Sequence, residues 1–184
     1  TPVRLLLAAS AGALLVGVGG MGVEGSGAPE GAALAWIAAF ALAGLACLWT
    51  FFSPLGRPRV VPSGRFSLVV VAIALPFAFA LGSTPTLPHA GVGFAEHAFG
   101  CFAYGSILAL PFLVVVGALD RSARPWPMLL AAFAAAAGLV ANAALVLHCG
   151  NTEPAHLAAG HATIGVVLAA LGALWAGLAH RSPS

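Results

Sequence analysis

Thiol and imidazole side chains gather in two polar segments, where they form the chain's best candidate for chemistry. One segment carries a histidine and a cysteine four residues apart, a spacing that places both on one face of a helix. Thiolate and imidazole are the ligands that soft and borderline metals prefer, and tetrahedral zinc sites use such sets. The candidate residues are His97, Cys101, His148, Cys149, His156 and His161. They indicate a site for Zn²⁺ or another soft metal ion, and haem is a less favoured cofactor.

The spacing of these residues matches no standard metal motif. His156 and His161 are five residues apart, which is about 140° around an ideal α-helix, so both can face one ion only if the helix is distorted. Histidines at a membrane interface can also simply extend towards lipid headgroups and helix ends. Two interpretations of the histidines therefore remain: ligands of a metal ion, or side chains with a purely structural role.

Cys101 and Cys149 favour a second kind of chemistry. In an oxidising compartment such as the bacterial periplasm two nearby thiols can form a disulfide, provided that their Cα atoms lie within about 7 Å. Cys47 lies near the opposite end of its helix and is not expected to join them. Both thiols could instead be buried packing residues. A sensing role for metal or redox state follows only if the pair is close.

The composition determines which elements must position these residues. The chain is 61% apolar and 7% charged, and its seven cationic residues are all arginine. A chain of this kind cannot cover itself with polar side chains, so lipid is its natural solvent. The arginines lie in four short segments that alternate with segments rich in histidine and acid. Because cationic segments stay cytoplasmic, this alternation predicts a polytopic protein of the bacterial inner membrane.

Six apolar stretches are long enough to cross the bilayer, which takes about 20 helical residues. The expected helices are 3–23, 31–52, 66–82, 91–119, 126–148 and 155–180. We therefore expect one all-α domain, a bundle of six transmembrane helices with both termini cytoplasmic. A cleaved signal peptide is the alternative for 3–23, but it would leave an odd number of helices. Pro76 suggests a kink, and the length of 91–119 suggests a tilt.

Small residues are frequent inside these stretches, notably in 131–138 and at Gly160, Gly165 and Gly172. They allow helices to approach closely where lipid supplies no hydrophobic drive, which predicts a tight bundle. Asn142 is expected to donate a hydrogen bond between helices. Thr152 or Glu153, followed by Pro154, is a good start for the last helix.

The arginine loops face the opposite side from the cysteines. They are candidates for binding an acidic protein partner, although the positive-inside rule and anionic lipid account for them equally well. The candidate partner-binding residues are Arg57, Arg59, Arg65, Arg121 and Arg124. No dense basic patch indicates nucleic-acid binding. No phosphate-binding loop or nucleophile elbow is present, so an enzyme is not expected.

The last two expected helices resemble those of the NrsF-type six-helix membrane anti-sigma factors. The resemblance is carried by residues 144–178, ALVLHCGNTEPAHLAAGHATIGVVLAALGALWAGL, with a Leu-His-Cys turn after the fifth helix. It extends to Cys101 with the following Ile107-Leu-Ala-Leu-Pro111, and to the short basic loop 120–124. The motifs cover about the last ninety residues, and the topology covers all six helices.

This resemblance implies a negative regulator that holds an extracytoplasmic-function sigma factor at the membrane and releases it after a signal at Cys101 and Cys149. Two departures bear on it. Family members carry a cytoplasmic segment before the first helix, where this sequence has only Thr1 and Pro2, and Cys149-Gly150-Asn151 replaces a common Cys-Pro-Glu. Two alternatives remain: an accessory subunit associated with other membrane subunits, and an integral-membrane haem or metal redox protein.

Overall fold

The computed structural model describes residues 31–52, 62–83, 93–119 and 127–179, and these residues form helices and no strands. The helices are α2 (Gly31–Phe52), α3 (Pro62–Gly82), α4 (Phe94–Leu119), α5 (Pro127–His148), α6 (Pro154–His156), the π-helix η1 (Leu157–Ala162) and α7 (Thr163–Ala179). The all-helical class predicted from composition is therefore confirmed. The expected helix 3–23 lies outside the described residues.

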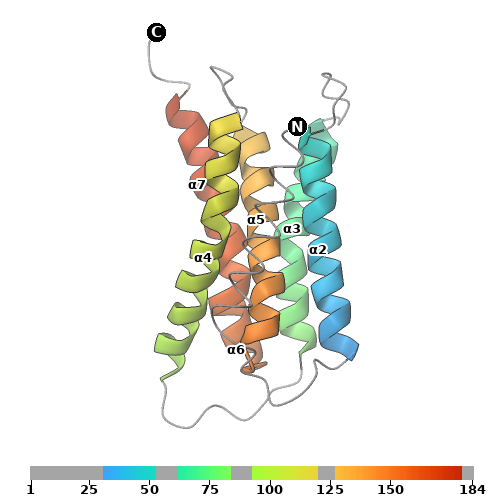
Figure 1. Cartoon of the computed structure of the whole chain (residues 1–184), viewed down its shortest axis with the longest axis vertical. Coiled ribbons are helices and arrows are strands. Elements are labelled where there is room, and N and C mark those ends of the chain that lie inside the picture. The colour runs from blue at the N-terminus through green and yellow to red at the C-terminus, as the bar shows by residue number, and fades with distance from the viewer. Residues whose placement is uncertain (1–30, 53–61, 84–92, 120–126, 180–184) are drawn as a thin grey trace.

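The helices run alternately up and down a bundle (Figure 1). Elements α6, η1 and α7 follow one another without a break, so together they form one long helix. The start of α4, the end of α5 and the start of α6 meet at the same end of the bundle. The candidate cysteines and histidines all belong to these three places, so the topology brings them to one end.

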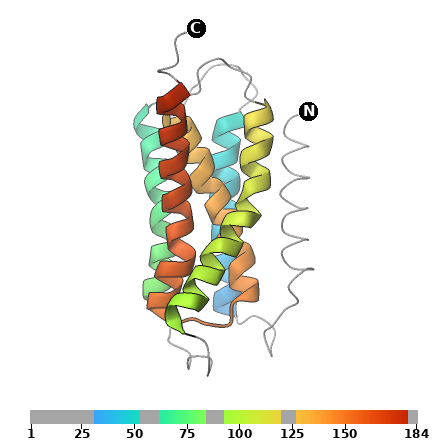
Figure 2. The ribbon, with the colours of Figure 1, turned by 90° about the vertical axis from the view of Figure 1, so that its left-hand side faces the viewer.

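The bounds of α2 match the expected 31–52, and those of the other described helices differ from the expected ranges by a few residues. Helix α3 begins at Pro62 rather than residue 66, because proline is well suited to the first turn of a helix. It stays helical through the buried Pro76. Helix α4 runs obliquely to its neighbours (Figure 2), as its 26 residues suggested. Glu153 is the N-cap residue of α6 and Pro154 follows it, which confirms the predicted helix start.

Helix α5 forms the centre of the bundle. Residues 133–145 are all buried, and α5 contacts α2, α3, α4 and α7. Its run of alanines, from Ala134 to Ala137, lets four neighbours pack around one thin helix. On one side the aromatic rings of α2 and α3 fill the space, with Phe40 and Phe79 5.7 Å apart edge to face.

Glycines bring the last long helix against α5. A Cβ atom on Gly138 would lie 2.7 Å from the Cα of Gly165, and one on Gly172 would lie 3.0 Å from the carbonyl oxygen of Leu130. Contacts this short leave no room for a side chain. The small residues thus have the role predicted for them, since they allow α5 and α7 to touch through their backbones.

Asn142 links α5 to the π-helix. Its side-chain Nδ2 donates to the carbonyl of Gly138 at 2.8 Å, within α5, and to the carbonyl of His161 at 3.2 Å. Asn142 is fully buried. The predicted interhelical hydrogen bond is therefore confirmed, and it fixes the backbone of the segment that carries His161.

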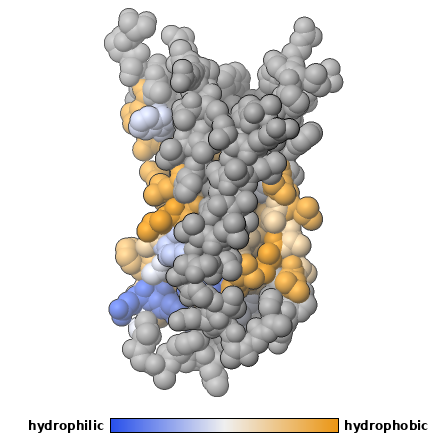
Figure 3. All heavy atoms as spheres, viewed as in Figure 1, coloured by the Kyte–Doolittle hydropathy of each residue, from blue (hydrophilic) through white to orange (hydrophobic). Residues whose placement is uncertain are grey.

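One helical stretch among the described residues, Pro154–Trp175, is long and apolar enough to cross a membrane by length and composition. Four other apolar stretches are shorter: Leu34–Leu45, Val69–Gly82, Phe94–Leu110 and Phe133–His148. The described residues therefore do not support six transmembrane helices. Apolar side chains nevertheless show at mid-height on both sides of the visible surface, and hydrophilic ones gather near the end where α4 begins (Figure 3).

We expect Gly138→Ala to destabilise the bundle by about 1–3 kcal/mol, because the new methyl group overlaps backbone that cannot rotate away. Thermal unfolding of the purified protein in detergent measures the effect. Gly177→Ala is the control, since a Cβ at Gly177 meets nothing within 4 Å. Equal melting temperatures for the two variants would show that the α5–α7 contact is not tight.

Candidate metal centre

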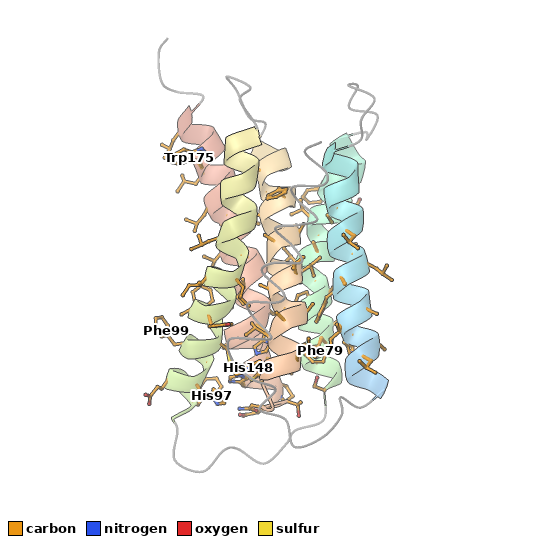
Figure 4. All side chains as sticks on the ribbon, viewed as in Figure 1. Phe79, His97, Phe99, His148 and Trp175 are labelled. Carbon is orange, nitrogen blue, oxygen red and sulfur yellow. The ribbon has the colours of Figure 1, made fainter. Side chains whose placement is uncertain are left out.

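Four side chains from two regions of the sequence, 97–101 and 149–156, converge at one end of the bundle. Their ligand atoms, one each from His97, Cys101, Cys149 and His156, all lie within 4.8 Å of one another. Figure 4 shows His97 at the lower end of the bundle, near the start of α4. Two thiols and two imidazoles are a donor set that tetrahedral zinc sites use.

Helix α4 supplies the first pair. His97 lies in the first turn, where its backbone N–H donates to the carbonyl of Gly93 at 3.0 Å. Cys101 follows one turn later on the same face. Cys101 is buried, whereas His97 is only partly buried. The histidine is therefore the more accessible donor of the pair.

The turn between α5 and α6 supplies Cys149. Its backbone N–H still donates to the carbonyl of Leu145, at 2.7 Å, so the thiol sits directly on the end of α5. The side-chain Oδ1 of Asn151 then accepts a hydrogen bond from the N–H of Glu153 at 2.9 Å, which is an Asx-type turn. This turn reverses the chain and starts α6 at Pro154, two residues before His156.

The π-helix brings the last long helix into the site. In η1, hydrogen bonds that join residues five apart place His156 and His161 roughly one turn apart, so both rings face the same region. Their ring centroids are 5.5 Å apart. The distortion that the five-residue spacing requires is thus present. The Thr163 hydroxyl, which donates to the carbonyl of Ala159, closes the widened turn.

Gly160 sets the distance between η1 and α4. A Cβ atom there would lie 2.9 Å from the carbonyl oxygen of Ala98 and 3.3 Å from the Cβ of Cys101. Only glycine lets the two backbones come so close. The donors of α4 and those of α6 can meet because of this contact.

The distances suit a single ion. The Sγ atoms of Cys101 and Cys149 are 3.7 Å apart, and the Cys149 Sγ lies 3.2 Å from Nε2 of His156. Around a tetrahedral Zn²⁺, bond lengths of about 2.3 Å to sulfur and 2.0–2.1 Å to nitrogen imply separations of about 3.8 Å and about 3.5 Å. The widest pairs, at up to 4.8 Å, need adjustments of about 1–1.5 Å to reach such geometry.

The site favours a thiolate at Cys149. The hydrogen bond that Cys101 donates lowers the pKa of the Cys149 thiol below its ordinary value, and His156 and the nearby His161 lower it further, although burial opposes them. A thiolate is the form that binds metal. In the reduced pair, the sulfur of Cys149 is therefore already in the form that binds a soft cation.

The predicted site residues do not all meet. His97, Cys101, Cys149 and His156 come together, whereas His148 and His161 are not among the four. The ring of His148 lies beside Tyr104, with centroids 6.2 Å apart. Cys47 is buried in α2, away from the pair, as expected. Of the arginine candidates, Arg57, Arg59, Arg121 and Arg124 lie outside the described residues, and Arg65 lies in the first turn of α3.

Comparison of the chain with protein-family models, with curated proteins and with solved structures finds no match.

We expect the Cys149 thiolate to persist to a lower pH than a free cysteine. Because the folded pKa lies below the unfolded one, its stabilising contribution is present above the unfolded pKa and is lost as the pH falls through the folded value. Ultraviolet thiolate absorbance of the metal-free protein, titrated in a Cys47→Ala background, measures this. His156→Ala should raise the pKa, because it removes one of the hydrogen bonds. An ordinary thiol titration in both proteins would contradict the assignment.

Proposed function

We propose that this chain is a membrane protein that binds a soft metal ion, with Zn²⁺ as the model case, through His97, Cys101, Cys149 and His156, and that it acts as a sensor. The observation that carries the proposal is the convergence of these four donors within 4.8 Å from two regions distant in sequence, 97–101 and 149–156. None of the four is a carboxylate, so hard cations such as Mg²⁺ and Ca²⁺ fit poorly. Four donors at this separation surround one ion, whereas haem iron takes its equatorial ligands from the porphyrin.

Charge balance supports metal in a buried site. Two thiolates neutralise a divalent cation, and two neutral imidazoles complete its shell without adding charge. The resulting complex has no net charge, so burying it among apolar side chains avoids most of the cost of a buried ion. Binding would release the remaining thiol proton, that of Cys101, to solvent, which makes affinity fall as the pH falls.

The same two sulfurs favour a redox signal as a second candidate. They are 3.7 Å apart and both are free thiols. A disulfide requires about 2.05 Å between the sulfurs and is formed when an oxidant removes two electrons and two protons. Oxidation and metal binding use the same atoms, so each excludes the other.

Membrane location is supported by helix length and by the outer surface. Helices α2, α3, α4 and α5 have 22, 21, 26 and 22 residues, which is about 32–39 Å at 1.5 Å per residue and matches a bilayer. Large apolar side chains point outward, with Leu81 83% and Trp175 69% exposed. Water is a poor solvent for such a surface. We infer a multi-pass protein of the bacterial inner membrane with the cysteine site outside.

The regulated partner is proposed from the resemblance to the NrsF-type anti-sigma factors. In that interpretation the chain holds an extracytoplasmic-function sigma factor at its arginine-bearing end and releases it when the cysteine site receives its signal. The described helix ends that flank the arginine loops, Phe52 and Pro62, lie at the end of the bundle opposite the site. Such a separation suits a sensor that transmits across a membrane.

We expect Cys101→Ala and Cys149→Ala each to weaken Zn²⁺ binding by at least about 100-fold, because loss of a direct ligand costs more than loss of a supporting group. Competition against a chromophoric chelator measures the affinity of the reduced protein in detergent. Cys47→Ala is the matched control, since Cys47 is also buried but lies in α2. Unchanged affinity in both site variants would disprove the metal centre.

We expect Cys101→Ser and Cys149→Ser to abolish the response of a sigma-dependent promoter to added Zn²⁺ or oxidant, because each removes a sulfur needed for either signal. A reporter in cells that co-express the chain and the sigma factor measures the response. Co-purification of the sigma factor with the membrane fraction is the companion test. A normal response in both variants would disprove the sensing role, and metal affinity would remain a separate result.

A further inference from the structure

His161 is a buried histidine with no assigned chemistry. It is only 1% exposed, and neither of its ring nitrogens has a hydrogen-bond partner. Buried polar atoms in native proteins are almost always paired with protein, water or an ion, so an imidazole with two unpaired nitrogens calls for a ligand. Nδ1 of His156 is unpaired as well.

The surroundings of His161 show where that ligand would be. The ring of His156 contacts two other imidazole rings. Its centroid lies 4.6 Å from that of His97 and 5.5 Å from that of His161. The π-helix turns His161 to the face of His156, and Asn142 holds the His161 carbonyl at 3.2 Å. His161 is therefore adjacent to the four-donor cluster and fixed by its backbone.

We propose, on the basis of the metal centre proposed above, that His161 is a fifth donor which replaces His97 when the metal ion moves deeper into the bundle. The two ligand sets share Cys101, Cys149 and His156. The outer set is completed by His97 from α4, and the inner set by His161 from η1. Only one of the two imidazoles coordinates at a time, because a tetrahedral ion with two sulfurs takes two nitrogens.

Burial gives the exchange its direction. His97 is partly buried and lies in the first turn of α4, so it can meet an ion arriving from outside. His161 is enclosed, so the inner set is shielded from water. An ion that passes from His97 to His161 gains a buried ligand whose ring nitrogens were unpaired. His97, in the first turn of α4, is then no longer a ligand. The exchange thus ties metal occupancy to the junction of η1 and α7.

A double-mutant cycle with Co²⁺ as the probe tests this. Wild type, His97→Ala, His161→Ala and the double variant are titrated in detergent, and affinity and the cobalt absorption bands are recorded. Each single variant should lose less than about tenfold in affinity, because the other histidine takes its place. The double variant should lose at least about 100-fold, more than the product of the single losses. X-ray absorption should count two imidazoles in each single variant and one in the double variant.

Two patterns would overturn the exchange. If His161 only supported His156, its removal would cost about 10–100-fold equally in both backgrounds, and the effects would be additive. If His161 had no role, His97→Ala alone would match the double variant. A loss for His161→Ala as large as for Cys149→Ala would also overturn it, since His161 would then be indispensable.

Controls separate folding from ligation. His148→Ala alters a histidine at the same end of the bundle that is outside both sets, and it should leave affinity and spectrum unchanged. Melting of the metal-free variants shows whether they fold, and His161→Gln supplies a second substitution if alanine destabilises the core. If the wild type shows no sulfur-to-cobalt charge-transfer band, the metal centre itself is disproved. If the wild type shows the band but the effects of the two histidine substitutions are additive, only the role of His161 is disproved.

Discussion

The architecture depends on the close contact of the last long helix with its neighbours, which glycine alone allows. Gly160 lets η1 touch α4 beside Cys101, and Gly138 and Gly172 let α7 touch α5. The first contact sets the distance between the two halves of the site, and the second fixes the helix that carries His156 and His161. A side chain at Gly160 would push η1 away from α4 and so separate the donors of the two halves.

The regular α-helical hydrogen-bond pattern has to change between His156 and His161 for both imidazoles to face the site. A regular α-helix would direct residues 156 and 161 about 140° apart, and one of the two imidazoles would then face away. The π-helix resolves this at a local cost, which the buried Asn142 and the Thr163 hydroxyl help to offset through their bonds to neighbouring carbonyls. Such π-turns often occur at functional sites, and here the turn coincides with the densest group of buried polar side chains in the described chain.

The sequence predicted the parts of this structure that follow from composition and local spacing. The helical class, the start at Glu153 and Pro154, and the hydrogen bond from Asn142 follow from hydropathy, capping chemistry and the cost of a buried amide. The pairing of His97 with Cys101 follows from helical spacing. The choice among four histidines could not be predicted, because it depends on where separate helices cross. From the sequence, the five-residue spacing of His156 and His161 indicated only that the helix must be distorted if both face one ion; that the distortion is a π-helix could not be predicted.

The position of the donors explains how binding could become a signal. Cys101 belongs to α4, Cys149 to the end of α5, and His156 to the start of the last helix, so a bound ion would join three elements that otherwise meet through glycines and alanines. These helices extend to the far end of the bundle as continuous rods (Figure 1). A helix that is held at one end and tightly packed in the middle moves as a rigid unit, because a close-packed interior does not deform continuously. Metal, disulfide and free thiols would hold the three helices at different separations, and each separation would give a different spacing between the described helix ends at the far end of the bundle.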